Sequence, residues 1–338
     1  MRKWIGWVAA LAALGAAGTA IGQAPPERPA AAKPGLDASV LHVQVILEKL
    51  GFGPGVLDGR SGLALTNALK GFQTQRGLPV TGKPDAATLR ALYPYRAIRP
   101  VKQVRLSEAM LAGPYFPQFP KDYAEQAKLP RLGYRSPMEK LAEMFHTTPA
   151  VLLELNSPTT PLRAGSAINV PNALPGSRNY PGDLPGDWRQ TLAMLNVDAN
   201  QPQGDRIEVD KSEGVLRVFN GERLVAQFTA TMGSEYDPLP IGNWKVTVID
   251  RNPDFKYNPK LFWDADRNDK AALMPPGPNG PVGVVWLDLT KEHYGIHGTP
   301  SPETIGRSES HGCIRLTNWD AARVAQMVKA GTPAVFKP

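Results

Sequence analysis

The stretch VLRVFNGERLVAQFTAT, residues 215–231, decides the fold of the C-terminal part of the chain. Branched and aromatic side chains, which favour strands, dominate residues 215–219 and 224–231. The dipeptide Asn220-Gly221 lies between them, and both residue types accept the positive φ that a two-residue hairpin turn requires. The stretch therefore predicts a β-hairpin.

Strand patterns continue on both sides of this hairpin. Apolar residues alternate with charged ones from residue 205. Further short strands are expected at 244–249, 282–289, 294–297 and 333–336. Asn318 can cap a helix at 319–330, which Gly331 would end. Residues 205–338 are thus predicted to form one mainly-β domain, long enough to bury its own core.

Two segments of this domain carry reactive side chains, Ile296-His297-Gly298-Thr299 and Ser310-His311-Gly312-Cys313-Ile314-Arg315. They contain the only cysteine of the chain and two of its five histidines. A protonated thiol is a poor nucleophile, but an imidazole can take its proton or hold the thiolate as an ion pair. Gly312 lets the backbone approach a substrate, so the amides of Gly312 and Cys313 can stabilise an oxyanion.

Other interpretations of these residues remain open from the pattern alone. A single cysteine often packs as a small hydrophobic residue. His297, His311 and Cys313 are also residue types that bind zinc. No ligand spacing typical of zinc sites repeats elsewhere, so we expect no metal and no cofactor.

The two segments, with the hairpin, Thr231-Met232-Gly233, Pro240-Ile241-Gly242 and Asp320, resemble the YkuD-type L,D-transpeptidase domain over about 130 residues. The resemblance implies that Cys313 attacks the third residue of a peptidoglycan tetrapeptide stem, releasing D-alanine and forming a thioester. An amine from another stem would give a 3→3 cross-link. A lysine of an outer-membrane lipoprotein would anchor that protein to the wall, and water would make the enzyme an L,D-carboxypeptidase.

The resemblance also assigns roles to individual residues. His297 would be the general base and then the general acid, with the Gly298 carbonyl orienting its other nitrogen. Arg315, where many members carry asparagine, could bind a substrate carboxylate or pair internally with Asp320. The predicted site comprises Cys313 and His297 as catalytic residues, Gly312, Ser310, His311 and Gly298 as shaping residues, and Arg315, Tyr294 and His293 as substrate-binding residues. For His293 and Tyr294, packing in a strand is the alternative.

Residues 252–281 are long and irregular for a link between strands, and they contain Phe255, Tyr257, Phe262 and Trp263. Long loops with little secondary structure of their own are often lids over active sites. We therefore expect this segment to form a flap over Cys313 that places its aromatic side chains against the peptide stem.

Residues 37–95 are predicted to form a small three-helix bundle. Apolar residues recur at helical spacing, Gly51 and Gly77 end the first two helices, and Asp85 can cap the third. The pattern Leu50-Gly51-Phe52, Asp58-Gly59, Phe72-Gln73, Gly77-Leu78 and Thr81-Gly82 resembles the peptidoglycan-binding three-helix domain. Glycan binding is implied by that resemblance alone.

Residues 131–172 have a β-α-α-β outline. Leu141-Ala142, Phe145, Leu155-Asn156 and Ile168-Asn169-Val170-Pro171 resemble a LysM domain. Ser136-Pro137-Met138 replaces the usual Gly-Asp-Thr turn, so a module that only packs against the rest of the protein is the alternative.

The N-terminus has the pattern of an export signal. Arg2 and Lys3 precede an apolar run at 4–21 and small residues up to Ala24, which predicts a signal peptide at 1–24 or an uncleaved membrane anchor. The remaining stretches are rich in Pro, Gly or Ala and are expected to be linkers, at 25–36, 96–130 and 173–204. We expect a monomer in the periplasm or associated with the cell wall.

Composition limits the classes of partner. The 338-residue chain carries a formal charge of +7, but its basic residues are scattered, which disfavours nucleic acid and fits a polyanionic wall. One cysteine excludes an intrachain disulfide and a four-cysteine zinc site. A wall-binding scaffold without activity is the alternative to an enzyme.

Overall fold

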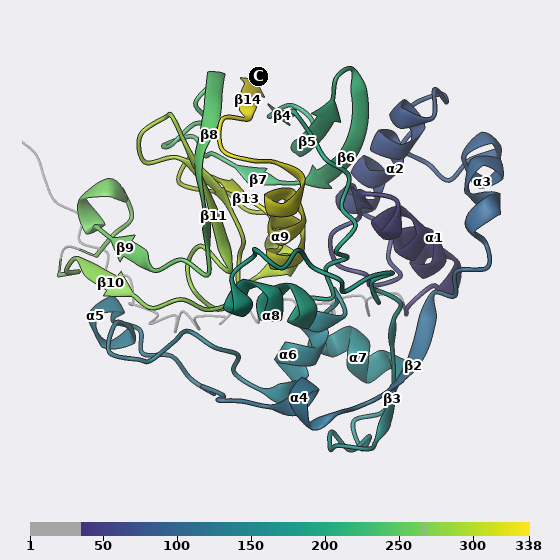
Figure 1. Ribbon diagram of the computed structural model, residues 1–338, viewed down its shortest axis with the longest axis horizontal. Coiled ribbons are helices and arrows are strands. Elements are labelled where there is room, and N and C mark those ends of the chain that lie inside the picture. The colour runs from purple at the N-terminus through teal and green to yellow at the C-terminus, as the bar shows by residue number, and fades with distance from the viewer. Residues whose placement is uncertain (1–34, 267) are drawn as a thin grey trace, which may run out of the picture. The chain divides into compact units, whose positions relative to one another are not determined.

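The computed structural model describes residues 35–266 and 268–338 (Figure 1). The predicted signal peptide at 1–24 and nearly all of the spacer at 25–36 lie outside the described residues. Within those residues, every helix is too short or too polar to cross a bilayer.

The C-terminal domain is built on a sheet of ten strands in the order β1-β6-β5-β4-β14-β8-β11-β12-β13-β7. The domain contributes nine of them, namely β4 (Arg206–Asp210), β5 (Val215–Asn220), β6 (Arg223–Thr229), β7 (Thr231–Met232), β8 (Gly242–Arg251), β11 (Val285–Leu289), β12 (Gly295–His297), β13 (Ile314–Arg315) and β14 (Pro333–Lys337). Its mainly-β character is therefore confirmed.

The predicted hairpin forms between β5 and β6, but its turn is displaced by one residue. Asn220 pairs with Arg223, so Gly221 and Glu222 make the turn, with Gly221 at φ 58°. A register shift follows Val218, because Phe219 pairs with Leu224 and leaves Val225 of β6 as the extra, unpaired residue of a bulge. The Asn220 side chain then donates to the Gln203 carbonyl instead of entering the turn.

Helices complete the core of this domain. Helix α9 (Asn318–Met327) is capped by Thr317, whose hydroxyl accepts from the Asp320 amide, and not by Asn318 as expected. Helix α8 (Gly186–Met194) lies within the stretch expected to be a linker at 173–204. Its Trp188 is buried in the same hydrophobic cluster as Trp319 of α9. Burial of this side chain makes 186–194 part of the domain.

The N-terminal bundle, residues 37–95, contains the three expected helices, α1 (Ala38–Lys49), α2 (Leu63–Gln75) and α3 (Ala86–Leu92), followed by the short η1 (Tyr93–Tyr95). Phe52 and Phe72 pack edge to face in its core, with ring centroids 5.9 Å apart. The two-residue strand β1 (Phe52–Gly53) pairs in parallel with β6. The bundle thus extends the sheet of the C-terminal domain by one strand.

The middle module, residues 101–171, departs from the β-α-α-β outline expected for 131–172, because its first strand lies before that range and four helices separate its two strands. Strand β3 (Ala167–Pro171) pairs antiparallel with β2 (Val101–Arg105), which lies in the stretch expected to be a linker at 96–130. Between them lie the short helices α4 (Glu108–Leu111) and α5 (Tyr123–Gln126) and the central pair α6 (Pro137–Met144) and α7 (Pro149–Leu155). A strand whose partner lies so far along the chain leaves no local pattern that marks it.

Candidate active site

Strands β12 and β13 bring the predicted catalytic residues to one face of the sheet. The two strands are parallel, with Ile296 opposite Ile314 and His297 opposite Arg315. Ile296 and Ile314 are fully buried in the core. Because side chains alternate along a strand, His297 and Arg315 point to the other face, and so does Cys313, two positions before Arg315.

The surroundings of the thiol agree with this placement. The Gly295 amide, at the start of β12, donates to the Cys313 sulfur and acts to lower the pKa of the thiol. The same sulfur lies 3.8 Å from the His293 carbonyl oxygen. Cys313 as a whole residue is half-buried. The sulfur is therefore held beside the strand that carries His297.

The His297 ring is fixed on two sides. Its Nδ1 donates to the Gly298 carbonyl oxygen at 2.7 Å, as the resemblance implies, and this assignment leaves the lone pair on Nε2. Trp286 of β11 stacks on the ring, with centroids 5.4 Å apart and planes 22° apart. Trp286 was missed in the sequence, where it is one alternating residue of a strand and carries no motif. The imidazole is thus presented as a neutral base in one orientation.

The pKa values favour a neutral pair at rest. Burial lowers the pKa of His297 to about 3, and the Arg315 charge adds to this effect, while the bond to Gly298 opposes it. Burial raises the pKa of Cys313 to about 11, against the opposing effects of the Gly295 amide and the Arg315 charge. Near neutral pH the resting site therefore holds a thiol and a neutral imidazole, and not a thiolate–imidazolium pair.

Ser310 and Gly312 shape the loop that enters β13. The Ser310 hydroxyl donates to the Cys313 carbonyl at 2.7 Å and accepts from the Gly233 amide at 2.6 Å. Gly312 has φ 87°, and a Cβ on it would lie 2.4 Å from the Tyr294 ring. Any larger residue at position 312 would be strained and would collide with that ring. The two residues thus hold the backbone of Cys313 in place.

The structure also places the remaining predicted residues. Tyr294 packs beneath Gly312, whereas the His293 side chain is exposed and only its carbonyl approaches the sulfur. Arg315 donates to the Glu309 carbonyl at 3.3 Å. Asp320, the alternative partner of Arg315, pairs instead with Arg323 at 3.3 Å.

Segment 252–281, the expected flap, contacts the loop before β13 through His311. It contains the antiparallel pair β9 (Phe255–Tyr257) and β10 (Ala272–Met274) with the short η2 (Pro259–Leu261). His311 Nε2 donates to Asp264 Oδ1 of the flap at 2.7 Å, and Phe262 meets the His311 ring edge to face at 5.0 Å. Asp264 was missed because it lies in an irregular loop, 47 residues away from His311.

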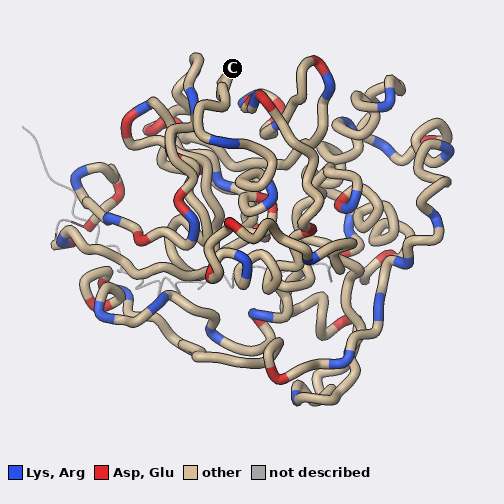
Figure 2. Tube along the Cα trace, in the orientation of Figure 1, with Lys and Arg blue, Asp and Glu red and all other residues tan. Residues whose placement is uncertain are grey.

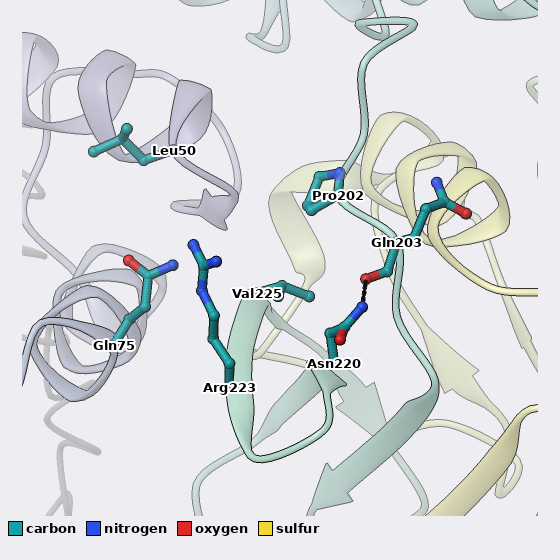
Figure 3. A pocket seen from close by; sticks show the side chains of 7 residues that line it. All are labelled: Leu50, Gln75, Pro202, Gln203, Asn220, Arg223 and Val225. Carbon is teal, nitrogen blue, oxygen red and sulfur yellow. Dashed lines mark hydrogen bonds between the residues drawn. The ribbon is translucent and has the colours of Figure 1, made fainter.

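A separate cleft of about 380 Å³ lies between the N-terminal bundle and the β5–β6 hairpin (Figure 3). It is lined by Leu50, Gln75, Pro202, Gln203, Asn220, Arg223 and Val225. These residues share no member with the site at Cys313. Among residues 35–266 and 268–338, no group of three His, Cys, Asp or Glu side chains is arranged to hold a metal ion.

Two family models match the chain. The YkuD model, described as an L,D-transpeptidase catalytic domain, matches residues 204–336. The PG_binding_1 model, of peptidoglycan binding domains, matches residues 37–92. Together they support the predicted C-terminal domain and the N-terminal bundle, whereas the relation of the middle module to LysM stays a prediction.

Named relatives carry the same assignment. The L,D-transpeptidase YkuD of Bacillus licheniformis is 30% identical over 203 residues, which cover 60% of this chain and 93% of that protein. The L,D-transpeptidase YbiS of Escherichia coli is 40% identical over 112 residues, or 29% of this chain and 36% of that protein.

Solved structures of L,D-transpeptidases also align with the chain. One from Mycobacterium smegmatis has a TM-score of 0.33 at 20% identity, over 39% of this chain and 58% of the other. One from Xylanimonas cellulosilytica has a TM-score of 0.37 at 16% identity, over 92% of this chain and 100% of the other. The assignment rests on the sequence matches: this chain belongs to the YkuD family of L,D-transpeptidases and carries an N-terminal peptidoglycan-binding domain.

Proposed function

We propose that the chain is a cysteine acyltransferase that acts on tetrapeptide stems of peptidoglycan through a thioester on Cys313. One observation carries the proposal. Cys313 and His297 lie on the same face of the sheet at the paired strands β12 and β13, and Nδ1 of His297 is hydrogen bonded to the Gly298 carbonyl. The Nε2 lone pair is then available for the thiol proton.

The first half-reaction forms the thioester. As Sγ of Cys313 bonds to the carbonyl carbon of the third stem residue, its proton passes to Nε2 of His297. The amides of Gly312 and Cys313 stabilise the oxyanion. The tetrahedral intermediate collapses by breaking the C–N bond to D-alanine, and the imidazolium returns its proton to the leaving amine.

The second half-reaction transfers the acyl group. A stem-peptide amine that attacks the thioester gives up its proton to His297, and the thiol is regenerated as a 3→3 cross-link forms. A lipoprotein lysine would attack the thioester by the same route, and so would water in the L,D-carboxypeptidase alternative. Because each acceptor meets the same thioester, the site residues alone favour none of them.

Arg315 gives the site a positive charge suited to the substrate. It lies on the same strand face as Cys313 and acts to lower the pKa of both Cys313 and His297. Stem peptides carry carboxylates, which a guanidinium binds in bidentate fashion. We assign Arg315 to binding of a donor carboxylate.

Two further assignments accompany this function. The chain would be exported, as the signal pattern at 1–24 predicts, and would act in the periplasm or at the wall as a monomer. The middle module would be LysM-like, a relation supported by its antiparallel β2–β3 pair and by the central helices α6 and α7, two of the four helices between the strands. Retention of the full chain on purified sacculi, and its competition by chitin oligosaccharides, tests the binding assignment.

The catalytic proposal is tested with purified enzyme and a disaccharide-tetrapeptide, with products identified by mass. Loss of D-alanine with formation of a dimer supports transpeptidation, and loss without dimer supports the carboxypeptidase. Cys313→Ala and His297→Gln should abolish both, whereas His42→Gln, on α1 of the N-terminal bundle, should not. If the wild-type protein leaves the tetrapeptide unchanged but is retained normally on sacculi, a wall-binding scaffold without activity would be favoured.

A further inference from the structure

The side chain of Asn318 lies directly against the peptide that orients His297. A Cβ placed on Gly298 would be 2.1 Å from Asn318 Oδ1, and one placed on Gly283 would be 1.9 Å away. The amide therefore fills the space between these two glycines. Its contact with Gly298 matters because the carbonyl of Gly298 accepts from Nδ1 of His297.

The hydrogen bonds of Asn318 fix its amide in one orientation. Oδ1 accepts from the Val284 amide at 3.3 Å, while Nδ2 donates to Glu143 Oε1 at 2.6 Å and to the Pro278 carbonyl at 3.1 Å. A flipped amide would place Oδ1 against two acceptors and Nδ2 against a donor. The orientation is thus determined by its partners.

The strongest of these partners comes from outside the C-terminal domain. Glu143 belongs to α6 of the middle module, is only 7% exposed, and accepts through its other oxygen from the Tyr134 hydroxyl. A buried carboxylate is costly unless its oxygens are bonded. Here Tyr134 bonds one oxygen and Asn318 bonds the other, so the middle module reaches the catalytic histidine through two side chains.

We propose that Glu143 and Asn318 are positioning residues for His297, the middle module holding the Asn318 amide and the amide holding the Gly298 peptide. The inference rests on the proposed role of His297. It assigns the middle module a part in catalysis in addition to any binding of glycan. The contact selects the Nδ1-protonated tautomer of His297, which leaves the lone pair on Nε2 for the thiol proton.

The test compares Glu143→Leu, Asn318→Ala and Glu143→Gln with Thr147→Val. Glutamine still offers an oxygen to Asn318 and serves as the rescuing variant. Thr147 is a buried residue of the same module whose hydroxyl donates to the Leu57 carbonyl at 2.8 Å, away from His297. It reports the effect of losing one buried hydrogen bond in this module.

The first readout is the ring ¹⁵N spectrum of His297 in the full chain, assigned with His297→Gln, and it needs no substrate. Wild type, Glu143→Gln and Thr147→Val should show protonation at Nδ1, while Glu143→Leu and Asn318→Ala should show a mixture of tautomers. The second readout is release of D-alanine. Both disruptive variants should lower kcat about tenfold to a hundredfold with little change in KM.

The outcomes separate this inference from the proposed function. If Glu143→Leu and Asn318→Ala show the wild-type tautomer and the same kcat as the control Thr147→Val, the two residues only stabilise the fold. The inference is then overturned. If Glu143→Leu does not fold, Asn318→Ala decides alone, since alanine is a good helix former at the start of α9. If wild type releases no D-alanine but the tautomers shift as expected, the function fails and the positioning stands.

Discussion

Arg323 of α9 and Glu48 of α1 form a buried ion pair, with Nη1 3.0 Å from Oε1 and Nη2 donating to the Glu48 carbonyl at 3.0 Å. His146 of the middle module places Nδ1 2.9 Å from the same carboxylate and stacks on Trp319 at 4.9 Å. All three parts of the chain therefore meet at one carboxylate. Over the described residues as a whole, Lys, Arg, Asp and Glu are spread along the trace (Figure 2).

Removal of this carboxylate should destabilise the protein strongly. Glu48→Ala removes the closer of the two carboxylates that Arg323 contacts, with Asp320 remaining at 3.3 Å, and we expect a loss of about 3 kcal/mol in the free energy of unfolding. Urea unfolding measures it. Glu125→Ala, which breaks an exposed pair with Lys128, should cost under about 1 kcal/mol. Equal losses of unfolding free energy in the two variants would contradict a larger contribution from the buried ion pair.

The reactivity of Cys313 should follow a neutral resting pair. Because burial raises the pKa of Cys313 to about 11 and lowers that of His297 to about 3, the thiolate is scarce near neutral pH. Alkylation by iodoacetamide should therefore accelerate about tenfold per pH unit from pH 6 to 9. Mass spectrometry follows the reaction at the only thiol. A plateau below pH 7 would instead indicate a thiolate–imidazolium pair.

The contact of Asp264 with His311 should hold the flap near the catalytic loop. Asp264→Ala removes the acceptor of the 2.7 Å bond, so we expect faster proteolysis at 258–271 and a KM raised severalfold with little change in kcat. Asp254→Ala, an exposed carboxylate at the base of the same flap, is the matched control. Identical cleavage patterns in both variants would show that His311 does not restrain the flap.

Glu143 should make the stability depend on pH. Burial raises its folded-state pKa to about 7, although the bonds from Tyr134 and Asn318 oppose this, whereas the unfolded chain titrates near about 4.3. Between these values the folded protein binds more protons, so its contribution is fully present below about pH 4 and is lost as pH rises through about 7.

Glu143→Gln should remove this dependence. From pH 4 to pH 8, wild type should lose on the order of 3 kcal/mol of unfolding free energy relative to Glu143→Gln. Urea unfolding at both pH values tests it. Parallel pH profiles for the two proteins would mean that folding does not raise the pKa of Glu143.

Local sequence was sufficient for much of the fold and for the centre of the site. The hairpin at 215–231 and the three helices of the N-terminal bundle follow from alternation, helical spacing and caps, which act over a few residues. The turn and the α9 cap were each misplaced by one residue, because neighbouring residues were equally suitable: Asn220 pairs with Arg223 instead of entering the turn, and the Thr317 hydroxyl makes the cap.

The sequence by itself determined that one thiol and one imidazole lie at the heart of a mainly-β domain, because their motif is contiguous and specific. Only the tertiary structure decided what supports them. Trp286 behind His297, Asp264 beside His311 and Glu143 behind Asn318 come from distant segments. The partner of a buried carboxylate or ring is chosen by how strands and modules pack in space, and such packing leaves no periodic trace along the chain.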